Sequence, residues 1–275
     1  GATLASSFQA STADEIDKSL KADLVVQPAT IGSLTTRLSA DKTKDIAAID
    51  GVKETSSYTL YVNAVTKPDG SQNPAATSLV IDPATYSSAY DIRVTSGSLS
   101  DLDATHVAVN KNENLKMGDK VTLTGPNGSV EATVGAIVDP KGIGGTYFYS
   151  PKVAAAVGSW TSPGTSTDPD HVLDAPLGML LTLEDGANLD TVRHKAEDIV
   201  ADTYQYSVND ASQLSDKVGQ RINQMLAVLY GLLGLSIVIA ILGIVNTLVL
   251  SVSERTREIG LMRAVGLGKA QLSGE

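Results

Sequence analysis

The sequence contains no cysteine, which excludes disulfides, thiolate metal sites and cysteine nucleophiles. It has three histidines and no G-x-S-x-G motif, so a hydrolase built on this chain would lack an evident general base. The phosphate-loop motif G-x-x-x-x-G-K-[ST] is absent, and in the run KGIGGTY at 141–147 Tyr147 replaces the third glycine of G-x-G-x-x-G. We therefore expect no catalytic residue, and any ATP chemistry should belong to another chain.

Basic residues are scarce over most of the chain. Residues 1–221 carry 28 acidic and 17 basic side chains. An acidic surface repels phosphate backbones, so we expect no nucleic-acid partner. The chain begins Gly-Ala-Thr-Leu, with no basic segment or apolar segment of a signal peptide, and we expect a fragment truncated at both ends.

Formal charge disappears between Arg221 and Glu254, a run of 32 residues. About 20 apolar residues are enough to cross the ~30 Å hydrocarbon core of a bilayer. The alternative is a buried helix of a soluble protein, but such helices keep a polar face and rarely exceed ~25 residues. The run predicts a transmembrane helix at 225–252, preceded by a helical stalk at 212–224.

Small residues recur every three or four positions along one side of this predicted helix: Ser236, Ala240, Gly243, Thr247 and Ser251. Either they let another helix pack closely, or they reflect the ordinary composition of membrane spans. The sequence leaves both interpretations open.

Basic residues follow the predicted span directly: Arg255, Arg257, Arg263 and Lys269. Positively charged flanks remain in the cytoplasm. We therefore expect residues 253–275 to be cytoplasmic and residues 1 to about 222 to be extracytoplasmic, with the span in the cell membrane. The first part of this segment predicts a short helix beginning near Ser253 and ending at Gly266 and Gly268. A general interpretation is a basic anchor at the lipid headgroups.

The stretch Gly243–Gln271, GIVNTLVLSVSERTREIGLMRAVGLGKAQ, resembles the cytoplasmic loop that follows a transmembrane helix in FtsX-like permeases, the MacB-type ABC transporter family. The resemblance implies a coupling segment at 253–275 that binds an ATP-binding subunit. That subunit would hold ATP and magnesium, so this chain would bind no cofactor or metal directly. A second permease copy or paralogue would complete a dimer. The residues implied to couple to the ATPase are Glu254, Arg255, Thr256, Arg257, Glu258, Ile259, Gly260 and Arg263.

The fold class predicted for the part before the span is an α+β extracytoplasmic domain at 1–211. This domain is followed by the stalk and the transmembrane α-helix. Periodicity predicts strand, helix and strand at 22–28, 40–49 and 55–65, and again at 178–185, 189–201 and 204–208. Two βαβ halves at 20–65 and 177–210 indicate a split ferredoxin-like lobe. An inserted β-rich lobe at 66–176 should contain a hairpin turned by Pro126-Asn127-Gly128. The arrangement resembles the MacB-like periplasmic core domain.

Polar residues in the outer domain are also considered as possible binding sites. Asp168, Asp170, His171 and Asp174 could hold a cation, but their spacing fits no ligand loop, and a solvated acidic loop is favoured. His106 and His194 show no partner pattern. Trp160 is interpreted as a loop or core residue.

Three functions remain open from the sequence. The first is a permease subunit that couples ATP hydrolysis in a partner to movement of the outer domain, for export or extraction of lipoprotein, lipid, peptide or drug. The second is an FtsX-like regulator that activates a cell-wall hydrolase without transport. The third is a merely tethered extracellular domain, which the specificity of residues 253–275 argues against.

Overall fold

The computed structural model describes residues 18–29, 36–140, 146–162, 165–203 and 205–264. Within them the chain forms two units, residues 18–219 and residues 220–264, which are considered separately. The strands are β1 (Leu24–Pro28), β2 (Val52–Thr66), β3 (Gln72–Ile81), β4 (Val94–Gly97), β5 (His106–Asn110), β6 (Lys120–Gly125), β7 (Gly128–Val138), β8 (Tyr147–Tyr149), β9 (Gly178–Leu183) and β10 (Tyr206–Asn209). The α-helices are α2 (Ala40–Ala47), α3 (Tyr86–Ala89), α4 (Pro151–Val157), α5 (Leu189–Val200) and α6 (Ala211–Ala264).

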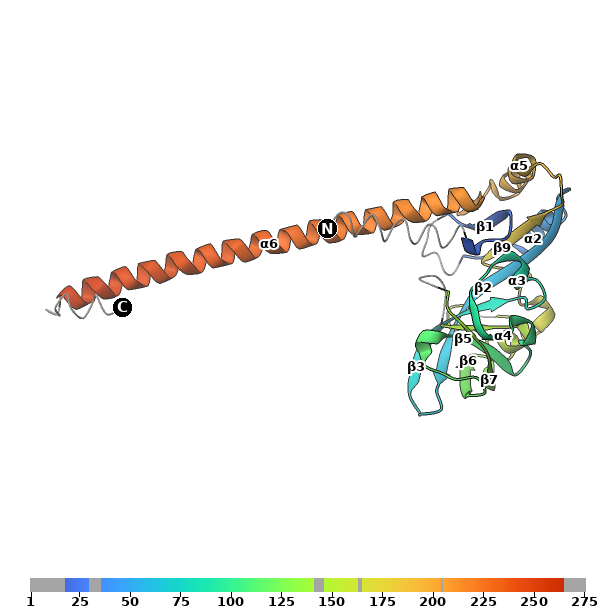
Figure 1. Cartoon of the computed structure of the whole chain (residues 1–275), viewed down its shortest axis with the longest axis horizontal. Helices are drawn as coiled ribbons and strands as arrows, with labels where there is room; N and C mark the ends of the chain where they lie inside the picture. Colours follow the sequence, from blue (N-terminus) through green and yellow to red (C-terminus); the bar gives the residue numbers. More distant parts are fainter. Residues whose placement is uncertain (1–17, 30–35, 141–145, 163–164, 204, 265–275) are drawn as a thin grey trace. The chain divides into compact units, whose positions relative to one another are not determined.

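All ten strands join one sheet, in the order β10-β1-β9-β2-β3-β8-β5-β7-β4, with β6 paired to β2 and β7. At one end, β10, β1, β9 and β2 are antiparallel neighbours. Strand β2 continues into the other end, where it pairs with β3 and β6 (Figure 1). Both ends of the sheet are therefore linked by hydrogen bonds through a single 15-residue strand.

The six elements expected in the two βαβ halves are confirmed, with ends displaced by a few residues. Both helices begin at residues with capping side chains. Ser39 accepts a hydrogen bond from Lys42 N at 3.3 Å, and Asn188 accepts one from Thr191 N at 3.0 Å. Their apolar faces pack with β1, β9 and β10 in one cluster, which includes Leu24, Ile46, Leu181, Val192, Ala196 and Val208.

The segment between the halves is rich in strands, as predicted. The β6–β7 hairpin is confirmed, since Gly125 pairs with Gly128 across a turn formed by Pro126 and Asn127. Asn127 also attaches this turn to α4, because its Nδ2 donates to Ala155 O at 3.0 Å and its backbone N to Val157 O at 2.9 Å. Strands of this region and α4 enclose a second apolar cluster that contains Tyr61, Val80, Val109, Leu123, Tyr149 and Val157.

Helix α6 runs from Ala211 to Ala264. The expected separate helix beginning near Ser253 is therefore wrong, because the backbone is already helical there and continues for eleven more residues. Ser253 would cap a helix only if the preceding turn had ended, and no proline or glycine lies between Asn246 and Glu258 to end it.

We predict that Leu181→Ala destabilises the outer domain by ~2–5 kcal/mol, because the removed atoms leave a cavity between β1, β2 and the two helices. Leu181 lies on the third strand of the sheet and has no exposed surface. Urea unfolding would measure the loss. Met117→Ala is the control, since Met117 is 45% exposed and its truncation leaves no comparable cavity. Equal effects of the two substitutions would contradict the central position of β9.

Candidate functional site

Helix α6 begins directly at the end of the last strand of the outer domain. Asn209 is the final residue of β10 and Ala211 the first of α6, so Asp210 is the whole connection. Asp210 Oδ1 accepts a hydrogen bond from Gln213 N at 2.8 Å, and Gln213 Oε1 accepts one from Asp210 N at 3.1 Å. This reciprocal pair is a capping box, which satisfies two backbone donors at the helix start.

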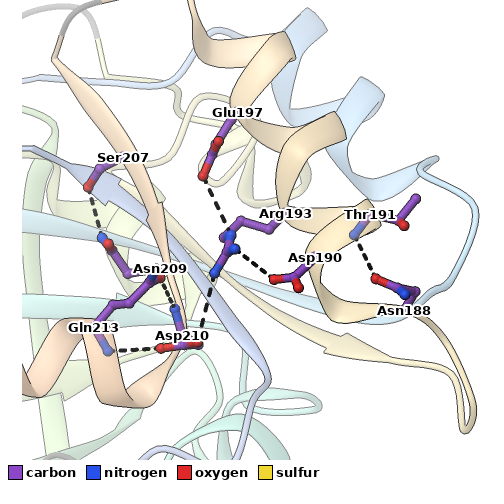
Figure 2. A network of polar contacts seen from close by, with 9 residues as sticks. All are labelled: Asn188, Asp190, Thr191, Arg193, Glu197, Ser207, Asn209, Asp210 and Gln213. Carbon is purple, nitrogen blue, oxygen red and sulfur yellow. Dashed lines mark hydrogen bonds and ion pairs between the residues drawn. The ribbon is translucent and has the colours of Figure 1, made fainter.

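Arg193 of α5 connects that cap to the neighbouring helix (Figure 2). Its Nη2 lies 2.6 Å from Asp190 Oδ1, its Nε 3.7 Å from Glu197 Oε1, and its Nη1 3.9 Å from Asp210 Oδ2. The side chain of Arg193 is 18% exposed. The guanidinium is therefore held among three carboxylates, two from its own helix and one from the first position before α6.

The first turn of α6 also makes apolar contacts. Ala211 and Leu214 pack, partly buried, against a third cluster that includes Leu20, Val25, Tyr86 and Phe148. The beginning of α6 is consequently part of the outer domain, held by packing, by its cap and by an ion pair. We call this region, Arg193, Asp210, Ala211, Gln213 and Leu214, the junction.

The apolar part of α6 matches the predicted span. Residues Asn223–Val249 are long and apolar enough to cross a membrane, and none of that window is buried by the described chain. Ser236 Oγ donates to Leu232 O and Thr247 Oγ1 to Gly243 O, both at 2.9 Å. Both hydroxyls are thus satisfied within the helix, as a span in lipid requires.

The small-residue side of α6 has no packing partner among the described residues, since Ala240 is exposed and a Cβ built on Gly243 would meet nothing within 4 Å. Packing of Ser236, Ala240, Gly243 and Thr247 against another helix stays a prediction. The side chain of Ser251 lies outside what the structure describes.

The predicted coupling residues lie in the last turns of α6. The backbone of Glu254, Arg255, Thr256, Arg257, Glu258, Ile259, Gly260 and Arg263 is helical, and only their backbone is described. Residues 265–275 of the predicted coupling segment lie outside the described residues. The roles of these side chains stay predictions.

The acidic cluster in the outer domain forms local contacts. Asp168 caps a short 3-10 helix by accepting from Asp170 N at 3.0 Å, and His171 Nδ1 lies 2.7 Å from Asp174 Oδ2. Its hydrogen bond with Asp174 raises the pKa of His171. No group of three or more possible metal ligands is found among the described residues.

Other residues considered in the sequence lie in varied surroundings. Tyr147 is 1% exposed in β8, and residues 141–145 of the glycine-rich run are outside the described chain. Trp160 is a loop residue, 51% exposed. His194 is exposed on α5. His106 does have a partner that the sequence analysis missed: its Nδ1 lies 2.8 Å from Asp103 Oδ1. Hydrogen bonds from Thr105 N and His106 lower the pKa of Asp103 to about 2.

Sequence reasoning also missed the junction. Asp210 and Gln213 carry a readable signal, since a capping residue followed three positions later by Glu or Gln marks a helix start. Arg193 carries no such signal, because it lies on α5 and meets Asp210 at the start of α6, with β10 between them in the sequence.

Comparison with known proteins places these features in one family. Residues 2–199 match the family model of the MacB-like periplasmic core domain, and residues 230–275 match that of the FtsX-like permease C-terminal region. The chain is 38% identical over 80 residues to the macrolide export ATP-binding/permease protein MacB of Rhodopirellula baltica, a match covering 29% of this chain and 11% of that protein. It is 25% identical over 96 residues to the uncharacterized ABC transporter permease YknZ of Bacillus subtilis, covering 34% and 24% respectively.

The outer domain also has a fold seen in a solved structure. The periplasmic region of MacB from Actinobacillus actinomycetemcomitans superimposes with a TM-score of 0.51 at 7% identity, covering 73% of this chain and 94% of that one. At that identity the likeness concerns the fold alone.

The two family matches, together with a charge-free candidate transmembrane helix, place the chain in the class of membrane permeases. The chain belongs to the MacB-like, FtsX-like permease family, which confirms the resemblance and the membrane localisation predicted from the sequence. The matched segments span only 11% and 24% of the two curated relatives.

We predict that Asp174→Asn lowers the pKa of His171 toward its ordinary value of 6.5, because the largest cause of the raised pKa is the hydrogen bond to Asp174. The contact stabilises the loop while His171 is protonated. Its contribution is full below pH 6.5 and is lost as the pH rises through the raised pKa. NMR titration of the imidazole protons measures it. Asp170→Asn is the control, since Asp170 is the smallest contributor, and a larger effect there would contradict the assignment.

Proposed function

We propose that the chain is the outer domain, span and coupling segment of an ABC transporter permease subunit. A single observation carries the proposal: one chain matches the MacB-like periplasmic core domain at residues 2–199 and the FtsX-like permease C-terminal region at residues 230–275. A separate ATP-binding subunit would hydrolyse ATP, holding the nucleotide and magnesium. This chain then contributes no catalytic residue.

In this proposal the final turns of α6 are the contact with the ATPase. Residues 253–275 lie in the cytoplasm and residues 1 to about 222 outside, as the basic flank at Arg255, Arg257 and Arg263 supports. Within the matched region, residues 254–260 spell E-R-T-R-E-I-G, with four formally charged side chains. Charged groups on the last turns of α6 suit a polar docking surface on a soluble subunit.

The outer lobe formed by β1, α2, β2, β9, α5 and β10 is proposed to be a split ferredoxin-like lobe at residues 20–65 and 177–210. Its support is the antiparallel order β10-β1-β9-β2, with each helix joining two of these strands. The β-rich segment at 66–176 is then an insertion that shares the sheet.

ATP-driven movement of the partner would shift α6 and, through the junction, the outer domain. The proposed cargo is a lipoprotein, lipid, peptide or drug that meets this domain outside the membrane. One curated relative is named for macrolide export. Reconstitution with labelled candidate substrates tests this proposal, and a chain that activates a cell-wall hydrolase while moving no substrate would refute it.

We predict that reversing two charges, Arg257→Glu with Glu258→Arg, abolishes co-purification with the ATPase and its stimulation, because like charges then face one another at the docking surface. The control is Lys195→Glu, an exposed residue on α5 of the outer domain. Association is measured by pull-down of the tagged permease from membranes, with ATPase activity assayed in the eluate. Unchanged association would show that residues 253–275 do not couple to the ATPase.

We predict that Gly243→Leu weakens pairing of two permease copies, because a large side chain on the small-residue side keeps helix backbones apart. Val245→Leu changes the helix two positions on, away from that side, and is the control. Energy transfer between labelled copies in vesicles measures the pairing. If Gly243→Leu and Val245→Leu behave alike, the small residues are ordinary span composition.

A further inference from the structure

The connection between β10 and α6 has a single residue in which a change of direction can occur. β10 ends at Asn209, where it pairs with Val25 of β1, and α6 begins at Ala211. Any rotation of the helix relative to the sheet therefore concentrates in the backbone around Asp210, because strand pairing fixes one neighbour and helix hydrogen bonds fix the other.

The two carboxylate oxygens of Asp210 have different partners. Oδ1 accepts the capping hydrogen bond from Gln213 N at 2.8 Å, while Oδ2 lies 3.9 Å from Arg193 Nη1 (Figure 2). The first contact forms within the start of α6. The second joins that start to α5, a separate helix of the outer domain.

Arg193 is oriented before it meets Asp210. Asp190 lies one turn earlier on α5, and its Oδ1 is 2.6 Å from Arg193 Nη2. Glu197 lies one turn later, and its Oε1 is 3.7 Å from Arg193 Nε. Helix α5 is itself anchored, since Val192, Ala196 and Val200 are buried in the core. A guanidinium fixed on a rigid helix loses little further freedom when it binds a carboxylate.

We propose that Arg193 is a positioning residue, whose ion pair with the capping Asp210 fixes the direction in which α6 leaves the outer domain and thereby couples movement of α6 to that domain. The coupling rests on the proposed function. An ion pair of this exposure shifts an equilibrium by about 1.4- to five-fold. The pair is thus strong enough to bias the angle of α6 and weak enough to open during a transport cycle.

The absence of cysteine makes the angle directly measurable. Lys195 on α5 and Asp216 on α6 are exposed, and each can be replaced by cysteine and spin-labelled without competing thiols in residues 1–275. The distance distribution between the labels would be recorded by pulsed electron resonance in the full permease with its ATPase, in lipid nanodiscs.

Two substitutions separate the ion pair from the cap. Asp210→Asn keeps a capping oxygen, because asparagine caps helices as well as aspartate does, but removes the charge facing Arg193. Arg193→Gln removes the opposite charge and leaves the cap intact. Asp198→Asn is the matched control, an exposed carboxylate on α5 outside the junction.

We expect both junction variants to broaden the distance distribution, and the double variant to broaden it no further. High salt should broaden it in the unmodified protein and have little effect in Arg193→Gln, since screening acts on the charge pair. Substrate moved per ATP should fall by up to about five-fold, the upper limit for an ion pair of this exposure. Asp198→Asn should alter none of these.

An unchanged distance distribution in Asp210→Asn and Arg193→Gln would overturn the positioning role. A broadened distribution with undiminished transport per ATP would overturn the coupling role. If the unmodified complex moves no substrate while the junction variants still broaden the distribution, the proposed transport function is wrong and the positioning of α6 by Arg193 stands.

Discussion

The apolar surface of α6 is the constraint on which the environment of this chain depends, because no described residue covers Asn223–Val249. Exposure of apolar surface to water is unfavourable by about 25 cal/mol per Å². A surface of this length is therefore stable only in lipid or against other apolar helices. The helix meets the requirements of lipid internally, since its backbone is hydrogen-bonded and the hydroxyls of Ser236 and Thr247 donate to carbonyls one turn earlier.

The outer domain obeys a different constraint, the continuity of its sheet. Strand β2 pairs with β9 in its first half and with β3 and β6 in its second half, so the two parts of the domain share hydrogen bonds instead of meeting at a loop. The connection at Asp210 is similarly short, because this single residue joins β10 to α6. Forces on α6 consequently act on a capped, packed and charged junction.

Much of this organisation could be predicted from the sequence. The six elements of the βαβ halves follow from period-two and period-3.6 patterns and from the caps Ser39 and Asn188, which are local properties. The span follows from the loss of charge after Arg221. The expected helix start at Ser253 was wrong because a capping residue is only a permissive signal, and the helix before it had no reason to stop.

The sequence by itself determined the membrane span, the family and the alternation of strands and helices, since each depends on neighbouring residues or on contiguous motifs. Only the tertiary structure decided that β2 serves both parts of the sheet. It also decided that Arg193 meets Asp210, residues brought together by the packing of α5 beside β10. Contacts of this kind depend on how separate elements are placed in space, and no periodicity along the chain encodes that placement.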